Sequence, residues 1–247
     1  MKPWLPATNR LEGKRILILA EVPDTAAREG RERPTSPVLE AEEAVATLVR
    51  AIVAEGGEVR LIGDTSLALL AGVVAGEYAV AELQEGQDTV PRLSVIVQRL
   101  ENEAQDPLDR LEALGSVRVN RMGDMRAALR EFGGGSDAMV CVGSGSPDDV
   151  EVFRRTNGAD RAVFVLAATG GGAARMSELA ESYRIDVADR AVEREAPLPQ
   201  AGDDVFGSET LDEGDPLPPM ALTAQWIVDR LIRGNERGPR LEPLARR

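Results

Sequence analysis

The chain has 247 residues, with 29 Lys and Arg against 42 Asp and Glu, which gives a formal net charge of −13, and it contains no histidine. The missing imidazole excludes Ser-His-Asp and Cys-His hydrolases, histidine general bases and zinc sites built on histidine. The net negative charge argues against a general binder of duplex DNA or of anionic membranes, because both attract basic surfaces.

Short apolar runs bounded by polar or glycine-rich sequence predict strands that are buried on both faces of a parallel sheet. These strands are 15–20, 58–62, 92–98, 138–142 and 162–168, and 116–120 is a further short extended segment. Apolar residues at helical spacing, N-caps and glycine C-caps predict helices between them. The helices are 38–55, the segment from the 63–66 turn to about Val80, 100–114 with a break at Pro107, 124–132, 148–155, 173–183 and 220–233.

This alternation of strands and helices predicts an α/β fold, a doubly wound and mostly parallel sheet of Rossmann-like type with helices on both faces. The main domain is expected at residues 14–190. The remaining parts are an N-terminal extension at 1–13, an acidic segment rich in Pro and Gly at 191–219, a C-terminal helix at 220–234 that packs on the domain or a partner, and a tail at 235–247.

Four loops with small or polar residues follow predicted strands, at the edge of the sheet where ligands of open parallel sheets bind. Glycine lets the backbone approach a ligand closely, and the N–H groups of a helix N-terminus bind anions such as phosphate. The candidate ligand-binding residues in these loops are Glu21, Asp24, Gly63, Asp64, Thr65, Gly143, Ser144, Gly145, Thr169, Gly170 and Gly171. The alternative is that the glycines only form the turns that every α/β fold needs.

None of these loops is a named phosphate motif. No GxGxxG spacing follows the first strand, and the chain contains no GxxxxGK[ST]. A simple NAD-binding Rossmann enzyme and a P-loop NTPase are therefore disfavoured.

A wider pattern extends over residues 14–183. It comprises AEVPDT, the helix EAEEAVATLVRAIVAEGG, RLIGDTSLALL, RMGDMRAALREF, SDAMVCVGSGSPDDVEVF and AVFVLAATGGGAA. This succession resembles the SLOG superfamily, a Rossmann-like fold shared by DNA-processing protein A, the LOG phosphoribohydrolases and nucleotide-sensing domains of bacterial defence systems and some ion channels. The most specific part is a helix with Met125 and Arg126, followed about 17 residues later by a glycine-rich turn and an acidic helix start.

The resemblance implies a nucleotide-binding cleft with named side chains. In LOG-type members an arginine on such a helix and a glutamate after a PGGxGT turn act on the ribose and phosphate of the nucleotide. Arg126 takes the position of that arginine. The turn falls on Gly143, Ser144 and Gly145, and the acidic position falls on Asp148, Asp149 or Glu151.

The turn departs from the pattern of the superfamily at three places. Val142 stands where the superfamily has a proline, Ser144 stands where it has the second glycine, and Pro147 is near the position of its phosphate-binding threonine. Each candidate also has a plainer interpretation: Arg126 on a solvated helix face, and acidic residues that only stabilise a helix start. Asp64 likewise either contacts ribose hydroxyls or caps the helix that follows it.

We therefore expect this protein to bind or sense a nucleotide or nucleotide-derived ligand such as ADP-ribose or NAD, and the resemblance implies a bacterial stress or defence system. One alternative is a LOG-type phosphoribohydrolase that cleaves the N-glycosidic bond of a nucleoside 5′-monophosphate. Another is a non-catalytic assembly subunit. An anionic ligand requires Arg126 and helix N-termini to create a positive pocket within a negative surface. No metal and no cofactor are expected.

The single cysteine, Cys141, excludes an intramolecular disulfide and favours a cytoplasmic location. No apolar run approaches the roughly 20 residues of a membrane helix, and the N-terminus does not lead into a signal peptide. The expected partners are a nucleotide-derived small molecule and further copies of the chain in a homo-oligomer. Neither a membrane nor sequence-specific nucleic acid is expected as a partner.

Overall fold

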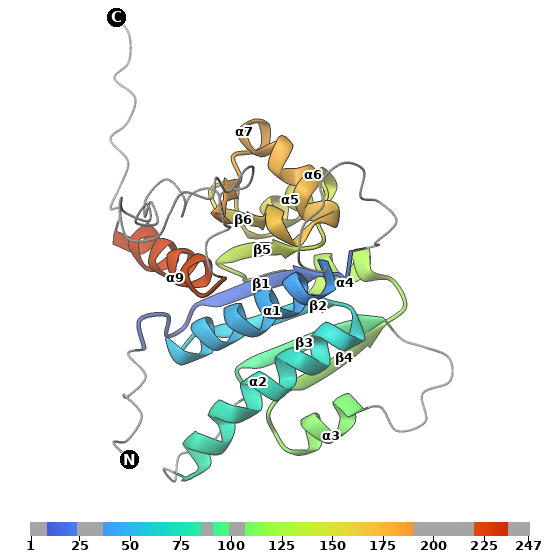
Figure 1. Cartoon of the computed structure of the whole chain (residues 1–247), viewed down its shortest axis with the longest axis vertical. Coiled ribbons are helices and arrows are strands. Elements are labelled where there is room, and N and C mark those ends of the chain that lie inside the picture. The colour runs from blue at the N-terminus through green and yellow to red at the C-terminus, as the bar shows by residue number, and fades with distance from the viewer. Residues whose placement is uncertain (1–8, 24–36, 85–90, 99–106, 190–219, 237–247) are drawn as a thin grey trace, which may run out of the picture.

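A single parallel sheet organises the protein. The computed structural model describes residues 9–23, 37–84, 91–98, 107–189 and 220–236 (Figure 1). Its strands are β1 (Arg15–Ala20), β2 (Glu58–Gly63), β3 (Leu93–Gln98), β4 (Arg118–Met122), β5 (Ala138–Val142), β6 (Ala162–Leu166) and β7 (Asp186–Val187). They form one sheet in the order β4-β3-β2-β1-β5-β6-β7, and every neighbouring pair is parallel. The predicted doubly wound α/β class is therefore confirmed.

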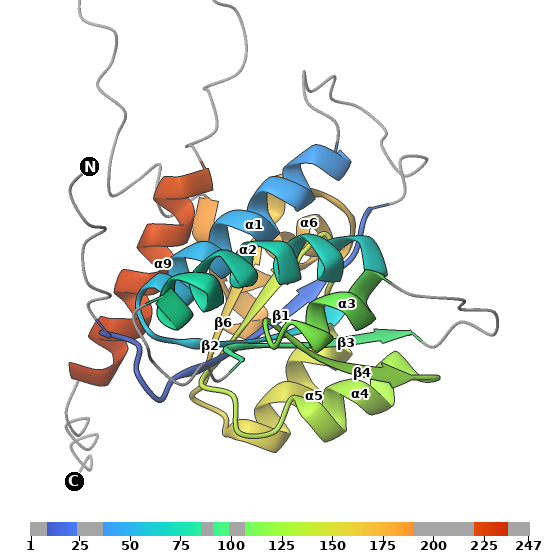
Figure 2. The ribbon, with the colours of Figure 1, turned by 90° about the horizontal axis from the view of Figure 1, so that it is seen from below.

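Helices cover both faces of this sheet. They are α1 (Pro37–Ala54), α2 (Thr65–Gln84), α3 (Pro107–Ala113), α4 (Met125–Phe132), α5 (Pro147–Asn157), α6 (Gly171–Glu178), α7 (Ala180–Tyr183) and α9 (Met220–Glu236). Figure 2 shows α1, α2 and α9 on one side of the sheet, with α4 and α5 on the other. The protein thus has three layers, as expected when crossover helices pack on both faces.

The pattern of β1 explains why both faces are covered. Ile16 and Ile18 belong to the apolar core under α1, α2 and α9, whereas Leu17 and Leu19 belong to the core under α4, α5 and α6. The last five residues of this strand are buried. A strand with apolar side chains on both faces is stable only between two helical layers.

The end of β6 differs from the sequence prediction. The predicted strand runs from 162 to 168, but β6 ends at Leu166 and a 3₁₀ turn, η2 (Ala167–Thr169), follows. The N–H of Ala168 donates to the carboxylate of Asp189 at 2.8 Å, and the hydroxyl of Thr169 donates to the Leu166 carbonyl at 2.6 Å. These side-chain bonds replace the strand hydrogen bonds and turn the chain.

Three further elements also differ. The predicted helix 173–183 is two helices, because the chain is interrupted at Leu179, and the two-residue strand β7 was not predicted. The extended segment 116–120 is the edge strand β4, shifted by two residues. Pro107 is the first residue of α3, a position where proline is common, and the part of the predicted helix 100–114 that precedes it lies outside the described residues.

The two ends of the described chain pack on the same domain. Leu11 is fully buried, and its N–H donates to the Glu55 carbonyl at 2.8 Å. Ala224, Ile227 and Val228 of α9 join the core beside α1, and the Trp226 ring meets Phe164 edge-on at a centroid distance of 6.0 Å. Among the described helices, none is long and apolar enough to cross a membrane.

Candidate functional site

The strand order reverses between β1 and β5. From β1 the chain builds outward through β2, β3 and β4, and then returns to place β5 on the other side of β1. The loops after β1 and β5 therefore leave the sheet in opposite directions. A reversal of this kind is where ligands bind in open α/β sheets, beyond the carboxyl ends of the strands.

The loops at this edge are tied to one another by hydrogen bonds. The carboxylate of Asp64 accepts the Val22 N–H at 2.6 Å, which joins the loops after β2 and β1. The Gly143 N–H donates to the Thr169 hydroxyl oxygen at 2.7 Å, which joins the turns after β5 and β6. The Gly143 carbonyl accepts the Gly172 N–H at 2.8 Å. The Glu21 N–H donates to the Val142 carbonyl at 3.1 Å, which links the two pairs, so the four predicted loops form one bonded assembly.

Three of the candidate glycines are required by the close approach of other backbone. A Cβ atom on Gly63 would lie 1.7 Å from the Ala20 carbonyl oxygen. A Cβ atom on Gly143, which has a φ of +64°, would lie 2.1 Å from the Glu21 carbonyl oxygen. A Cβ on Gly171, with a φ of +56°, would lie 2.1 Å from the Gly143 carbonyl oxygen. Pro23 also packs against Gly143 and Gly171. The backbone at these turns therefore approaches other backbone of the same chain.

The remaining candidates of these loops occupy varied surroundings. Ser144 and Thr169 are buried, and Glu21 is exposed. Gly63 ends β2, Thr65 begins α2, and Gly170 precedes α6. Gly145 follows Ser144 in the turn before α5 and is half-buried. Asp24 lies outside the described residues.

The four candidate catalytic residues gather in a different place. Arg126, Asp148, Asp149 and Glu151 line one pocket of about 230 Å³ between α4 and α5. Leu129 and Val152 supply apolar wall, and Arg130 and Arg155 complete the lining. The arginine of α4 and the acidic start of α5, which the sequence analysis paired, therefore lie close together. The glycines of the β5 and β6 turns do not line this pocket.

Arg130 and Arg155 are pocket residues that the sequence reasoning missed. Arg130 follows Arg126 by four positions on α4, and Arg155 follows Glu151 by four positions on α5. Residues four apart lie on the same helix face. The spacing of four residues from Arg126 and from Glu151 therefore predicts that Arg130 and Arg155 face the same pocket.

The three acidic residues differ in what they already bind. Ser146 caps α5: its hydroxyl accepts the Asp149 N–H at 3.2 Å and donates to the Asp149 carboxylate at 2.7 Å. Glu151 forms a 2.7 Å ion pair with Arg155. Asp148 is exposed and has no hydrogen bond or ion pair to the described residues, and the same holds for the guanidinium of Arg126. Arg126 and Asp148 are therefore the two candidates whose charges remain available.

The charge of this pocket is balanced. Its lining holds three arginines and three acidic residues. The positive pocket expected around Arg126 is therefore not found there. The N-terminus of α5 adds little positive potential to the pocket. Pro147 has no N–H group, and the Asp149 N–H already donates to the Ser146 side chain.

Cys141 lies beneath this region on β5 and is fully buried. Burial and, to a smaller degree, the negative charge of Asp149 together raise the pKa of the thiol to about 12. The thiol is therefore neutral at physiological pH and unsuited to nucleophilic chemistry.

Comparisons of this chain with family models, curated proteins and solved structures give no match.

Proposed function

We propose that this protein binds a nucleotide or nucleotide-derived ligand, with the phosphate and ribose in the pocket between α4 and α5. The observation that carries the proposal is the gathering of Arg126 and Asp148 in one pocket, both without a partner among the described residues. A guanidinium presents planar paired donors that match phosphate oxygens. A carboxylate accepts hydrogen bonds from ribose hydroxyls.

The size and charge of the pocket narrow the ligand. Its volume of about 230 Å³ is smaller than that of most small-molecule sites, which hold about 300–1,000 Å³. A ribose phosphate suits this space better than a whole dinucleotide, so the base extends beyond the pocket. The balanced lining also favours a ligand that carries hydroxyl groups beside its phosphate over a bare polyanion.

The sequence resemblance supports the same proposal. We propose membership of the SLOG superfamily on the succession of motifs and on the proximity of Arg126 to the acidic start of α5. What supports a sensing role over catalysis is the state of the carboxylates, since Asp149 bonds to Ser146 and Glu151 pairs with Arg155.

Hydrolysis of a nucleoside 5′-monophosphate is a second candidate, favoured by the availability of Asp148. A carboxylate placed beside the ribose would stabilise the positive charge that develops on the sugar as the N-glycosidic bond breaks. Incubation with AMP tests this directly. Release of free adenine that is lost in Asp148→Asn supports hydrolysis, and an absence of adenine after prolonged incubation rejects it.

Titration calorimetry with AMP, ADP-ribose and NAD tests the binding proposal. We expect at least one ligand to bind, and Arg126→Ala to weaken it about tenfold or more, because a charged hydrogen bond to phosphate is lost. Arg118→Ala is the matched control, since Arg118 is exposed on the edge strand β4. If none of the three ligands binds, or if Arg126→Ala binds as the parent chain does, the proposal is wrong.

A further inference from the structure

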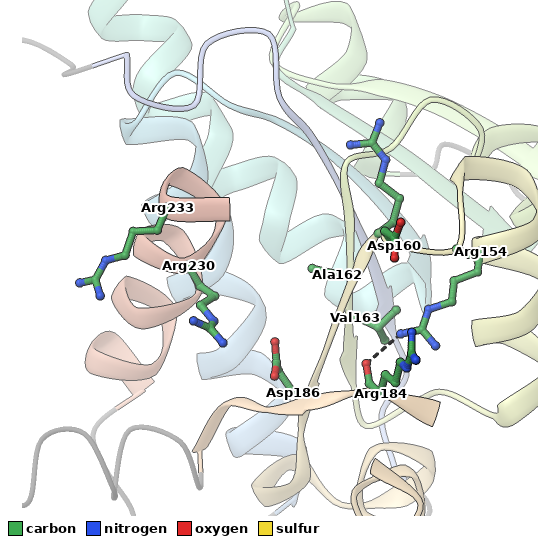
Figure 3. A pocket seen from close by; sticks show the side chains of 10 residues that line it. Arg154, Asp160, Ala162, Val163, Arg184, Asp186, Arg230 and Arg233 are labelled. Atoms are coloured by element: carbon green, nitrogen blue, oxygen red, sulfur yellow. Dashed lines mark hydrogen bonds between the residues drawn. The ribbon is translucent and has the colours of Figure 1, made fainter. Parts of the chain in front are cut away.

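A second pocket lies at the amino ends of β6 and β7. It holds about 270 Å³ and is formed by the last turns of α5, the first residues of β6, the start of β7 and the C-terminal half of α9 (Figure 3). Its lining contains five arginines and two aspartates. In a chain with 29 basic and 42 acidic residues, this is a local reversal of charge.

Two of the five arginines are directed elsewhere. Arg161 forms a 2.9 Å ion pair with Asp137, which neutralises its charge. Arg233 points away from the other side chains in Figure 3. The cationic character of the pocket therefore comes from Arg154, Arg184 and Arg230.

Arg154 is held in place without being neutralised. Its guanidinium donates to the carbonyls of Tyr183 and Arg184, the second at 2.8 Å. Its Nε atom is buried and has no hydrogen-bond partner. Burial and the neighbouring charge of Arg184 lower the pKa of Arg154. The charge of Asp160 raises this pKa as a smaller, opposing influence. The guanidinium is therefore fixed by neutral acceptors and forms no ion pair with a described carboxylate.

Arg184 and Arg230 bring two more cations to the same space. Arg184 has a φ of +49°, a left-handed conformation that glycine would adopt more easily. Arg230 comes from α9 on the other side of the pocket, with its guanidinium 5.7 Å from the centre of the Trp226 ring. Among the described residues, neither forms an ion pair with a carboxylate.

We propose that Arg154, Arg184 and Arg230 form a binding site for a phosphoryl oxyanion, either free phosphate or pyrophosphate or the phosphoryl group of a small organic phosphate. Three guanidinium groups around a space of this size match an anion with several oxygen acceptors. The charge repulsion between them is relieved when such an anion binds. The site is separate from the pocket between α4 and α5, so the proposal does not depend on the proposed function.

Asp160 and Asp186 shape what this pocket accepts. They line it together with the arginines, and against Arg154, Arg184 and Arg230 they leave an excess of one positive charge. In Figure 3 Asp186 lies between Arg184 and Arg230. A carboxylate at that place accepts a hydrogen bond from a hydroxyl group or from a monoprotonated phosphate.

The test is calorimetric titration of the full chain, at low ionic strength, with inorganic phosphate, pyrophosphate and glucose 6-phosphate. Arg184→Gly is the informative variant, because it removes the charge and leaves a residue that suits the left-handed backbone. Arg230→Gln tests the opposite wall. We expect each substitution to weaken binding about tenfold or more.

Arg118→Ala is the control and is expected to bind these anions as the parent chain does, whereas Arg126→Ala reports any binding of them in the pocket between α4 and α5. Tighter binding of glucose 6-phosphate than of the inorganic ions would identify an organic phosphate as the source of the group, and the reverse would identify a free ion. Three results would overturn the proposal: no binding of any of the three compounds, equal weakening by Arg118→Ala and Arg184→Gly, or loss of binding only in Arg126→Ala.

Discussion

The carboxylate of Asp64 accepts the backbone N–H of Val22 at 2.6 Å, and through this bond the loop after β1 is held against the turn after β2. The Asp64 N–H in turn donates to the Ala20 carbonyl at 3.1 Å, and the Asp64 carbonyl accepts the Ala68 N–H at 2.9 Å, which begins α2. One residue thus fixes the start of a helix and the exit of the central strand. Neither interpretation of Asp64 from the sequence, as a ribose contact or as a helix cap, included this bond, which joins residues 42 positions apart.

We expect Asp64→Ala to lower the free energy of unfolding by about 1–3 kcal/mol, because the Val22 N–H loses its acceptor in a partly buried place. Asp64→Asn is the matched variant: its amide oxygen can still accept this bond, so its loss should be smaller. Urea unfolding followed by circular dichroism measures both. Equal losses in the two variants would contradict the role of the acceptor oxygen.

The close contact at Gly143 predicts a large effect of one methyl group. Gly143→Ala should lower the free energy of unfolding by about 3 kcal/mol or more, since a left-handed backbone strain adds to overlap with the Glu21 carbonyl. Gly115 has a similar φ of +75°, but a Cβ there would meet no atom within 4 Å. Gly115→Ala should therefore cost only about 1 kcal/mol.

The two alanine variants separate the cost of left-handed backbone strain from the cost of overlap with another carbonyl. The midpoints of urea unfolding of the two variants give the comparison. Similar losses for Gly143→Ala and Gly115→Ala would show that the turns at the carboxyl edge are looser than their contacts imply. A much larger loss at Gly143 would confirm that this glycine is required by packing between turns, whatever ligand the protein binds.

The strands and helices with strong apolar patterns could be predicted from the sequence. β1 and β5 have the bounds expected, because their apolar runs end where glycine or polar residues begin. The short β7 could not be predicted because two residues carry no periodic pattern, and the end of β6 could not be predicted because it depends on Asp189. This buried carboxylate binds the Ala168 N–H from 21 positions away. A bond between distant residues leaves no local signal in one sequence.

The candidate site could be predicted only in part, because some of its features are local in sequence and others depend on contacts between distant residues. Helix positions and acidic first turns are local features, and they correctly brought Arg126 together with Asp148, Asp149 and Glu151. A glycine-rich turn is expected both where the backbone approaches a ligand and where it packs on other backbone. The sequence alone does not distinguish these two cases. The distances at Gly63, Gly143 and Gly171 show that these turns contact the chain's own backbone. The arginines of the second pocket come from α5, the start of β7 and α9, so no window of sequence contains them.

Asp148 and Asp149 are adjacent in sequence, yet we expect them to differ in function. Asp149→Ala should lower the free energy of unfolding by about 0.5–1.5 kcal/mol, because the reciprocal bond with the Ser146 cap is lost. Asp148→Ala should change stability by no more than about 0.5 kcal/mol, as is usual at exposed positions. If the proposed function holds, Asp148→Ala should weaken nucleotide binding.

Stability and binding must be measured on the same two variants, by urea unfolding and by calorimetry. Ser146→Ala serves as the control for capping alone, with an expected loss of about 1 kcal/mol. A loss of stability in Asp148→Ala as large as that in Asp149→Ala would contradict the division of roles between them.

Cys141 predicts a specific dependence of stability on pH. The thiol has an ordinary pKa of 9.0 in the unfolded chain, and burial raises the pKa to about 12 in the folded protein. Above pH 9 the unfolded chain therefore loses its proton while the folded chain keeps it. The contribution of Cys141 to stability is complete below the unfolded pKa and is lost as pH rises toward the folded pKa, by up to about 1.4 kcal/mol per pH unit.

Cys141→Ala is the reference, because other groups titrate in the same range and contribute equally to both proteins. The difference in free energy of unfolding between parent and variant should be constant from about pH 7 to 8 and should shrink above about pH 9. A thiol reagent should label the parent only after urea unfolding, since a buried neutral thiol is a poor nucleophile. Rapid labelling of the folded chain at neutral pH, or a difference that stays constant at alkaline pH, would show that β5 opens at this position far more readily than its burial implies.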